Sequence, residues 1–357
     1  MRRLYLRMKI GITYNLKSAG ASGPGLPDDF QEEFDSPATI EAIASVIRGL
    51  GHDVILLGDG RDLLRRLLDQ PPDFVFNFAE GEGVSRSREA RVPAVLEMLG
   101  IPYTGSDPLT MAVTLDKDCA KRLVASARIA VPQALAIHPT DLEWKIDVPF
   151  SRLPFPVIVK PAWEGSSKGI RQKCLVNSPD ELPEVIDWLR GEQRQPILVE
   201  EYIEGDEVTV GILGNDDPVV LGMMRVSPVS GMDRFVYSLE VKRDFRRLVR
   251  YECPAPLPPP VTAAVREAAL TVFRLLGCRD VARIDFRIKD GIPHFLEVNP
   301  LPGLNPQDSD LVIMANLVGW SHARLVETIL QAAMKRCDCK SQIADCRLGG
   351  KTVGHGN

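Results

Sequence analysis

The most informative segment of the chain reads Val281-Ala-Arg-Ile-Asp285-Phe-Arg-Ile-Lys-Asp290-Gly291-Ile-Pro-His-Phe-Leu-Glu297-Val-Asn299-Pro300. Two runs of alternating character flank a Lys-Asp-Gly turn, a pattern that predicts a β-hairpin. Side chains alternate between the two faces of a strand, so Arg283 and Asp285 share one face, as do Glu297 and Asn299. We therefore expect strand pairing to gather three oxygen donors beside a guanidinium.

Oxygen donors of this kind suit Mg²⁺, which proteins often hold with one or two carboxylates plus substrate phosphates. Asp285, Glu297 and Asn299 are therefore candidate metal ligands, and the hairpin points to nucleotide chemistry. An edge hairpin with solvated charges would carry a similar pattern. The remaining segments of the chain have to decide between the two interpretations.

Four segments upstream of the hairpin carry further candidates. Lys117 lies in a helical stretch, Lys160 ends an apolar run, and a loop of small residues, Trp163-Glu164-Gly165-Ser166-Ser167-Lys168-Gly169, follows it. The fourth segment is Ile197-Leu-Val-Glu200-Glu201-Tyr202-Ile203-Glu204-Gly205-Asp206-Glu207. In this order the chain resembles the ATP-grasp superfamily and, within it, the D-alanine–D-alanine ligases. The fragments Leu99-Gly-Ile-Pro-Tyr-Thr-Gly-Ser106 and Glu297-Val-Asn-Pro-Leu-Pro-Gly303 match as well, so the resemblance covers roughly residues 8–332.

Composition limits the class of protein. The 357 residues are 45% hydrophobic and 25% charged, and the net charge is −5, which gives no general nucleic-acid footprint. We find no apolar segment near the ~20 residues that span a bilayer, and the basic start lacks the apolar core of a secretory signal. We expect a cytoplasmic protein with small-molecule partners, without nucleic-acid or membrane partners. Seven cysteines without regular spacing do not suggest a disulfide scaffold.

The pattern of elements predicts mixed α/β and α+β architecture. A β-α-β-α-β rhythm indicates a Rossmann-like parallel sheet in residues 1–112. The resemblance implies that a two-lobed ATP-grasp fold follows, with a central lobe over 113–199 and a C-terminal lobe over 200–334. A last helix is expected from Ala323 to Met334. Residues 335–357, which include Cys337, Cys339 and Cys346, are expected to form a flexible tail.

The resemblance implies an ATP-dependent carboxylate–amine ligase that works through an acyl phosphate. It assigns Glu200 to the adenine amino group, the backbone near Tyr202 and Ile203 to the ring edge, and Glu207 to the ribose. Phosphates would meet two lysines and a covering loop. These phosphate-binding candidates are Lys117, Lys160, Glu164, Gly165, Ser166 and Ser167.

The resemblance also implies catalytic groups around the hairpin. Asp285, Glu297 and Asn299 would hold two Mg²⁺ ions, with Mn²⁺ as a substitute, and Arg283 would bind the acyl-phosphate or oxyanion oxygen. The backbone N–H of Gly303 would assist. Lys242 matches the lysine of the family's Glu-Ala-Lys-Tyr segment, and Ser166 contributes a hydroxyl to the loop over the phosphates.

Departures from the family concentrate at substrate positions. The acid that grips the first substrate corresponds to Glu32 or Glu33, and the sequence does not choose between them. Arg243 replaces the family's tyrosine and could pair with a substrate carboxylate. Asn77-Phe-Ala-Glu-Gly-Glu-Gly83 replaces a His-Gly-rich motif. Ser309 and Leu311 match the family's Ser-His-Ser-Leu stretch only loosely.

Two classes of function remain open at this point. The first is a peptide-forming ligase, with D-alanyl-D-alanine as the default product and another amino acid or small carboxylic acid as the runner-up substrate. The second is a nucleotide-binding module without ligase activity. The first is favoured because a mere binding protein need not keep Lys160, Arg283 and three metal ligands together. By analogy with the family, a homodimer is an additional expectation.

Overall fold

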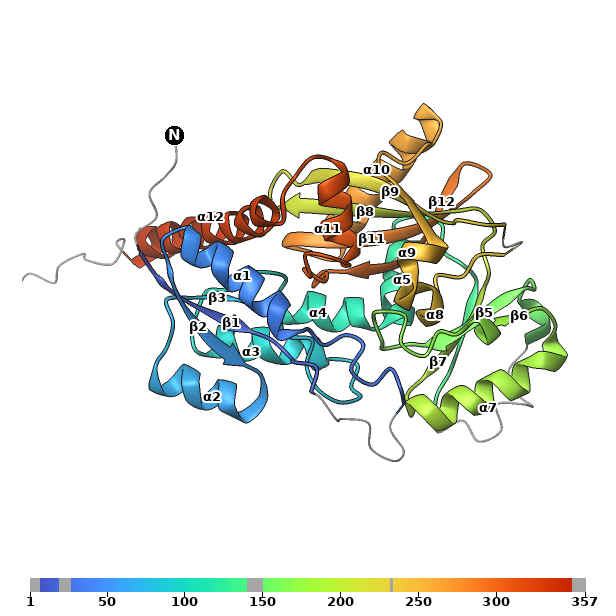
Figure 1. Cartoon of the computed structure of the whole chain (residues 1–357), viewed down its shortest axis with the longest axis horizontal. Helices are drawn as coiled ribbons and strands as arrows, with labels where there is room; N and C mark the ends of the chain where they lie inside the picture. Colours follow the sequence, from blue (N-terminus) through green and yellow to red (C-terminus); the bar gives the residue numbers. More distant parts are fainter. Residues whose placement is uncertain (1–6, 19–26, 140–149, 232–233, 349–357) are drawn as a thin grey trace, which may run out of the picture.

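The computed structural model describes residues 7–18, 27–139, 150–231 and 234–348. Three sheets organise them, and helices cover the sheet faces (Figure 1). Residues 1–6, 19–26, 140–149, 232–233 and 349–357 lie outside the described ranges, and the last of these contains the end of the expected tail. None of the helices in these ranges combines the length and apolar character that a bilayer crossing needs.

The N-terminal region is the predicted parallel sheet, with strand order β2-β1-β3. Its strands are β1 (Lys9–Thr13), β2 (Asp53–Gly58) and β3 (Phe74–Phe76). Helix α1 (Pro37–Gly49) begins where the Ser36 hydroxyl accepts a hydrogen bond from the Thr39 N–H, as its Ser-Pro start predicts. The other helices here are α2 (Gly60–Asp69), α3 (Arg91–Met98) and α4 (Pro108–Leu115).

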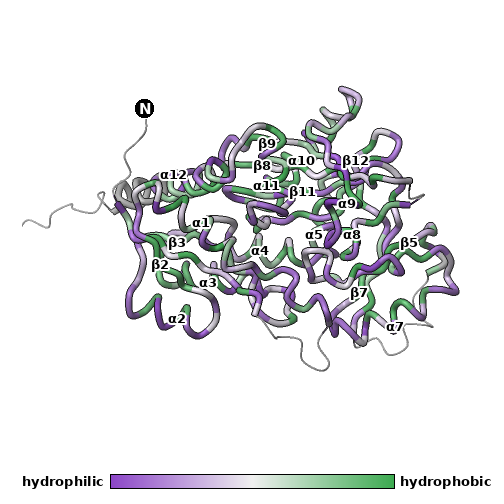
Figure 2. Tube along the Cα trace, viewed as in Figure 1, coloured by the Kyte–Doolittle hydropathy of each residue, from purple (hydrophilic) through white to green (hydrophobic). Residues whose placement is uncertain are grey.

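The central lobe is an antiparallel sheet with strand order β4-β7-β5-β6. Helix α5 (Lys117–Ser126) leads into it, and helix α7 (Leu182–Gln193) packs on β5 and β7. Hydrophobic and hydrophilic residues alternate along α7 and α2 in Figure 2, as expected of helices that bury one face. The strands are β4 (Ala134–Ile137), β5 (Val157–Pro161), β6 (Leu175–Val176) and β7 (Ile197–Glu201).

The C-terminal lobe contains the predicted hairpin at one end of a five-stranded antiparallel sheet, ordered β10-β9-β8-β11-β12. Asp290 and Gly291 have φ of 52° and 78°, the left-handed pair that a tight hairpin turn requires. The strands are β8 (Asp206–Gly214), β9 (Val219–Pro228), β10 (Val249–Glu252), β11 (Asp280–Lys289) and β12 (Ile292–Asn299).

Helices cover both faces of this sheet. Helix α10 (Pro259–Leu275) packs on β8, β11 and β12, and α5 packs on β12. Helix α11 (Asp310–Leu317) packs on β9, and α12 (His322–Leu348) packs on β8 and β11. Two short helices, α8 (Leu239–Arg243) and α9 (Phe245–Leu248), lie where the sequence pattern indicated mainly strands.

Helix α12 corrects one prediction, because it continues to Leu348 and does not end at Met334. The apolar periodicity of the sequence is lost after Met334 because polar contacts hold the helix there. The Arg336 guanidinium donates to Asp280 at 2.7 Å and to the Tyr103 carbonyl at 2.8 Å, which fixes the next turn of the helix through polar contacts.

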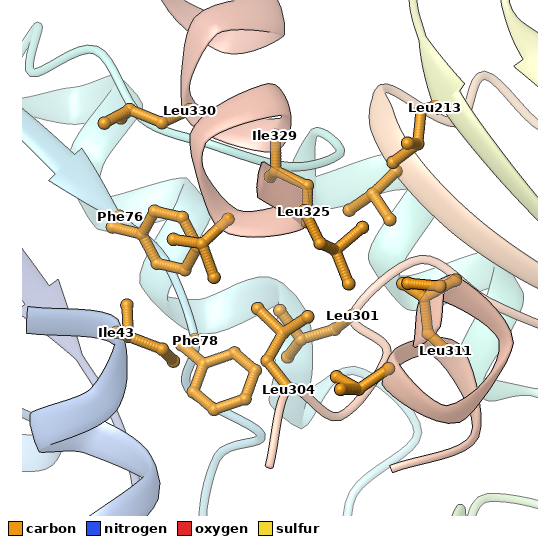
Figure 3. Packing of buried hydrophobic residues seen from close by; sticks show 14 of the residues in the cluster. Ile43, Phe76, Phe78, Leu213, Leu301, Leu304, Leu311, Leu325, Ile329 and Leu330 are labelled. Carbon is orange, nitrogen blue, oxygen red and sulfur yellow. The ribbon is translucent and has the colours of Figure 1, made fainter. Parts of the chain in front are cut away.

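One hydrophobic core joins the N-terminal sheet to the C-terminal lobe (Figure 3). Ile43 of α1 and Phe76 of β3 pack in the same cluster as Leu325 and Ile329 of α12, and all four are at most 2% exposed. The N-terminal region therefore shares its main core with the lobe that carries the hairpin. The central lobe has a cluster of its own, which includes Val159 and Leu189.

Truncation of this shared core should destabilise the whole protein. We expect Ile329→Ala to lower the free energy of unfolding by about 2–5 kcal/mol, because a buried side chain of this size leaves a cavity. Urea unfolding followed by circular dichroism measures the change. Gln331→Ala, at an exposed position on the same helix, is the matched control and should stay near wild type.

Candidate active site

The hairpin presents four polar side chains on one face. Strand pairing sets Asp285 directly opposite Glu297 and Arg283 opposite Asn299. On its other edge β11 pairs with β8, which brings the Thr209 hydroxyl to donate to Asp285. The three oxygen donors and the guanidinium expected from the alternation pattern thus lie together.

Arg283 is held from two sides. Its guanidinium lies 2.9 Å from Asp285 and 3.2 Å from Asp310, at the start of α11. The Tyr237 hydroxyl donates to the same Asp310 at 3.1 Å. Burial opposes the charge on Arg283, but these carboxylates outweigh it and raise its pKa. Asp310 was missed from the sequence because only the fold brings α11 to the hairpin.

The two opposed carboxylates titrate differently. Burial and the nearby charge of Glu297 raise the pKa of Asp285 above its usual range. Burial also disfavours the charge of Glu297, yet Lys117, Lys160 and Arg283 lower its pKa to about 2. The Lys117 ammonium lies 3.2 Å from Glu297 and also donates to the Glu164 carbonyl.

The donor set fits a divalent cation that also binds phosphate. Like charges directly opposite on a sheet destabilise it, so Asp285 and Glu297 favour a cation between them. Asn299 accepts a hydrogen bond from the Leu301 N–H at 2.8 Å, and its carbonyl oxygen keeps a second lone pair. Within the described ranges, no three His, Cys, Asp or Glu side chains converge as a metal site. Two carboxylates and an amide suit Mg²⁺ bound together with phosphates.

A cavity of about 940 Å³ adjoins this face, between the central lobe and the C-terminal sheet. Most of the residues that the family resemblance assigns to ATP binding line it together. They are Lys160, Ser166, Ser167, Glu200, Tyr202, Ile203 and Glu207, beside Lys242 and the hairpin residues Arg283, Asp285 and Glu297. Lys117 and Asn299 line an adjoining cavity of about 440 Å³. We name the two the nucleotide cavity and the inner cavity.

Glu200 is fully buried and lies between two lysines. Its carboxylate pairs with Lys160 on β5 and, at 2.8 Å, with Lys121 on α5. Burial lowers the pKa of Lys121 to about 8, although Glu200 opposes the shift. The sequence analysis did not single out Lys121. Its position four residues after Lys117 puts both on one face of α5, a spacing that could have indicated it.

Glu207 has a partner that the sequence analysis also passed over. Arg287 lies 2.8 Å from the Glu207 carboxylate and donates to the Tyr202 hydroxyl at 3.0 Å. Its guanidinium carbon lies 4.9 Å from the centre of the Tyr202 ring. The period-two spacing of Arg283, Asp285 and Arg287 along β11 was the available signal.

The loop over the nucleotide cavity has strained backbone at two serines. Ser166 and Ser167 have φ of 49° and 59°, a conformation that costs roughly 1–3 kcal/mol at each non-glycine residue. The Ser167 hydroxyl donates to the Tyr237 carbonyl at 2.9 Å. Gly165 approaches Glu33 so closely that an added Cβ would lie 2.8 Å from the carboxylate. The loop is therefore held in shape by contacts on both sides.

Glu33 and Glu164 belong to a buried ion cluster with Arg88 and Lys168. Arg88 lies 2.9 Å from Glu33 and 3.3 Å from Glu164, and Lys168 lies 3.2 Å and 2.5 Å from the same two acids. Glu164 does not line the nucleotide cavity and instead anchors the loop from behind. Arg88 was not anticipated, because its partners are 55 or more residues away.

The tentative substrate residues are placed differently from the expectation. Arg243 donates to Asp28 at 2.8 Å and to Glu32 at 2.9 Å, so two of the candidates satisfy each other. Leu311 is fully buried in the shared core. The Ser309 hydroxyl accepts from the Asn305 N–H at 2.9 Å and lies against Gly303. We therefore no longer assign Leu311 or Arg243 to substrate contact.

Comparisons with known proteins agree with this arrangement. Residues 123–331 match the family model described as D-ala D-ala ligase C-terminus. The D-alanine–D-alanine ligase of Aquifex aeolicus is 35% identical, over 82% of this chain and 93% of its own. An uncharacterized protein of Sinorhizobium fredii, y4sG, is 34% identical, over 83% and 87%. In fold, the ATP complex of the Bacillus anthracis D-alanine–D-alanine ligase gives a TM-score of 0.72 at 22% identity, covering 93% of this chain and 99% of that one. The chain belongs to the D-alanine–D-alanine ligase family of ATP-grasp ligases.

Proposed function

We propose that this ATP-dependent ligase joins the carboxylate of one amino acid to the amine of another, with D-alanine as the default for both. The observation that carries the proposal is the one face of the β11–β12 hairpin that holds Arg283, Asp285, Glu297 and Asn299 beside the two cavities. A site of this kind combines phosphate, metal and oxyanion recognition. The similarity to D-alanine–D-alanine ligases supports the choice of D-alanine.

ATP would occupy the nucleotide cavity. We assign Glu200 to the adenine amino group, the backbone at Tyr202 and Ile203 to the ring edge, and Glu207 to the ribose. Phosphate oxygens would meet the ammonium groups of Lys160 and Lys117, which act as point charges. Ser166 and Ser167 would cover the phosphates with backbone N–H groups and hydroxyls.

Asp285, Glu297 and Asn299 would hold two Mg²⁺ ions, with Mn²⁺ as a substitute. When bound, the metal neutralises charge on the transferring phosphoryl group. The residues themselves orient that end of the nucleotide toward Arg283. Because these residues lie on paired strands, the surrounding backbone hydrogen bonds limit how far their side chains can be displaced.

The reaction then needs two steps. A carboxylate oxygen of the first amino acid attacks the γ-phosphorus, and the bond to ADP breaks, which leaves an acyl phosphate. The amine of the second amino acid, having lost a proton, attacks the acyl carbon, and phosphate departs. Arg283 and the N–H of Gly303 would stabilise the oxyanion that forms in between.

The residues first considered for the substrate, Glu32, Glu33 and Arg243, are all held in ion pairs. Another amino acid or a small carboxylic acid is therefore the second candidate. We place the reaction in the cytoplasm, where ATP is available, and include a homodimer by analogy with the family. A nucleotide-binding module without activity is disfavoured by the intact hairpin face.

The first experiment follows ADP and phosphate release with ATP and Mg²⁺ across single and paired D- and L-amino acids, with mass spectrometry of the products. We expect release that depends on an amino acid and a product with a dipeptide mass. D-alanine dependence would support the default substrate, and dependence on another amino acid the second candidate. ATP binding without release under any pair would contradict the ligase proposal.

The metal assignment predicts loss of turnover at the hairpin. Asp285→Asn and Glu297→Gln should abolish ADP release while the circular dichroism spectrum stays unchanged, because each removes a charged ligand from a folded sheet. Asp290→Asn, at the exposed turn of the same hairpin, is the matched control and should turn over ATP normally. Wild-type rates in either site variant would refute the assignment.

Asp310 is predicted to act as a positioning residue through Arg283. Asp310→Asn should reduce kcat roughly tenfold to a hundredfold, since a small misplacement of a catalytic group has effects of that size. The KM for ATP should hardly change, because Arg283 meets the acyl group and not the base or ribose. An increase in the KM for ATP with an unchanged kcat would contradict this role.

A further inference from the structure

The inner cavity holds two acids that the proposed reaction does not use. Glu80 and Glu89 line it together with Lys117, Ser166, Arg283 and Glu297. Ser166, Arg283 and Glu297 also line the nucleotide cavity, so the two cavities meet at the place proposed for acyl transfer. A small molecule that presents its carboxylate at Arg283 would extend toward Glu80 and Glu89.

An amino-acid substrate carries an ammonium group that needs an anionic partner. Three other acids near this end of the site, of which Glu33 and Glu164 also line the inner cavity, have cationic partners. Glu32 pairs with Arg243, and Glu33 and Glu164 share Arg88 and Lys168. To admit a further cation, any of these acids would have to give up an ion pair.

Glu89 differs from those acids in having no such partner. It is 7% exposed, it faces the inner cavity, and within the described residues neither it nor Glu80 makes a hydrogen bond or ion pair. Arg88, the preceding residue in the chain, donates instead to Glu33 and Glu164. A carboxylate on a largely buried residue that opens into a cavity and has no cationic partner is partly desolvated, and a bound cation would offset that cost.

We propose that Glu80 and Glu89 bind the ammonium group of the amino acid whose carboxylate is activated. This inference rests on the proposed ligase function and names the part of the site that recognises that substrate. An organic ammonium needs only one or two carboxylates.

The charges around the pair are consistent with a site that awaits a cation. Burial is the largest influence on Glu89 and raises its pKa. The charge of Arg88 lowers this pKa and the charge of Glu33 raises it, and the result is a pKa of about 7. Burial, Glu89 and Glu33 raise the pKa of Glu80, with Asp35 adding to the shift and Arg88 opposing it. Lys117 lowers and Glu164 raises the pKa of Glu89. Since only the ionised acids attract an ammonium, amino-acid binding should strengthen as pH rises through 7.

The test uses the amino acid that gives the fastest ADP release in the panel, with hydroxylamine in place of the second amine. Hydroxylamine traps the acyl phosphate as a hydroxamate, so the first substrate is followed alone. The full-length variants Glu89→Gln and Glu80→Gln are compared with the wild type. Glu82→Gln, an exposed acid of the same loop, is the matched control.

We expect Glu89→Gln and Glu80→Gln to raise the KM for the amino acid about tenfold or more, as loss of a charged hydrogen bond does. The KM for ATP should stay within about twofold, and Glu82→Gln should match wild type. The wild-type KM for the amino acid should fall between pH 6 and pH 8, and Glu89→Gln should lose this dependence.

Two results would overturn the inference. One is an unchanged KM for the amino acid in both glutamine variants. The other is a parallel rise in the KM for ATP with an unaltered pH profile, which would reveal a merely structural role. A wild-type protein that forms no hydroxamate with any amino acid would instead reject the proposed function, so the two failures are distinguishable.

Discussion

The site depends on the register of strand β11 between its two neighbours. β11 pairs with β8 on one edge and β12 on the other, which sets Asp285 beside both Thr209 and Glu297. Because a slip of one residue would turn every side chain to the opposite face, this register alone decides whether the hairpin presents a site. The apolar residues of the opposite face, such as Ile284 and Phe286, pack against α10 and fix it.

Around the two cavities next to this sheet, paired charged side chains occupy positions that apolar side chains usually fill. Glu200, Glu33 and Glu164 are buried and Arg283 is partly buried, and each is matched by at least one group of opposite charge. Buried ion pairs contribute little net stability, but removal of one partner is costly because it strands the other. We therefore regard these pairs mainly as a means of fixing the positions of charged groups around the two cavities.

The local elements were predictable and the long-range pairings were not. Alternation and turn chemistry predicted the hairpin, and the β-α-β rhythm predicted the parallel sheet. Lys121 and Arg287 follow the helical and strand periods of residues already chosen, so they could have been found. Asp310, Arg88 and the contact between Arg243 and Glu32, 211 residues apart, could not, since only the folded chain brings them together.

The shared core has a mechanical consequence. Because α12 packs against both α1 and the C-terminal sheet, the wall that carries Glu80 and Glu89 and the hairpin form one unit. The central lobe, with its separate cluster, contacts that unit through ion pairs such as Arg171 to Asp28 and Asp29, and through a small apolar cluster that joins Ile158 and Cys174 to Val236. Entry and exit of a nucleotide should then proceed by a hinged displacement of the central lobe, while Glu80, Glu89 and the hairpin keep their positions relative to one another.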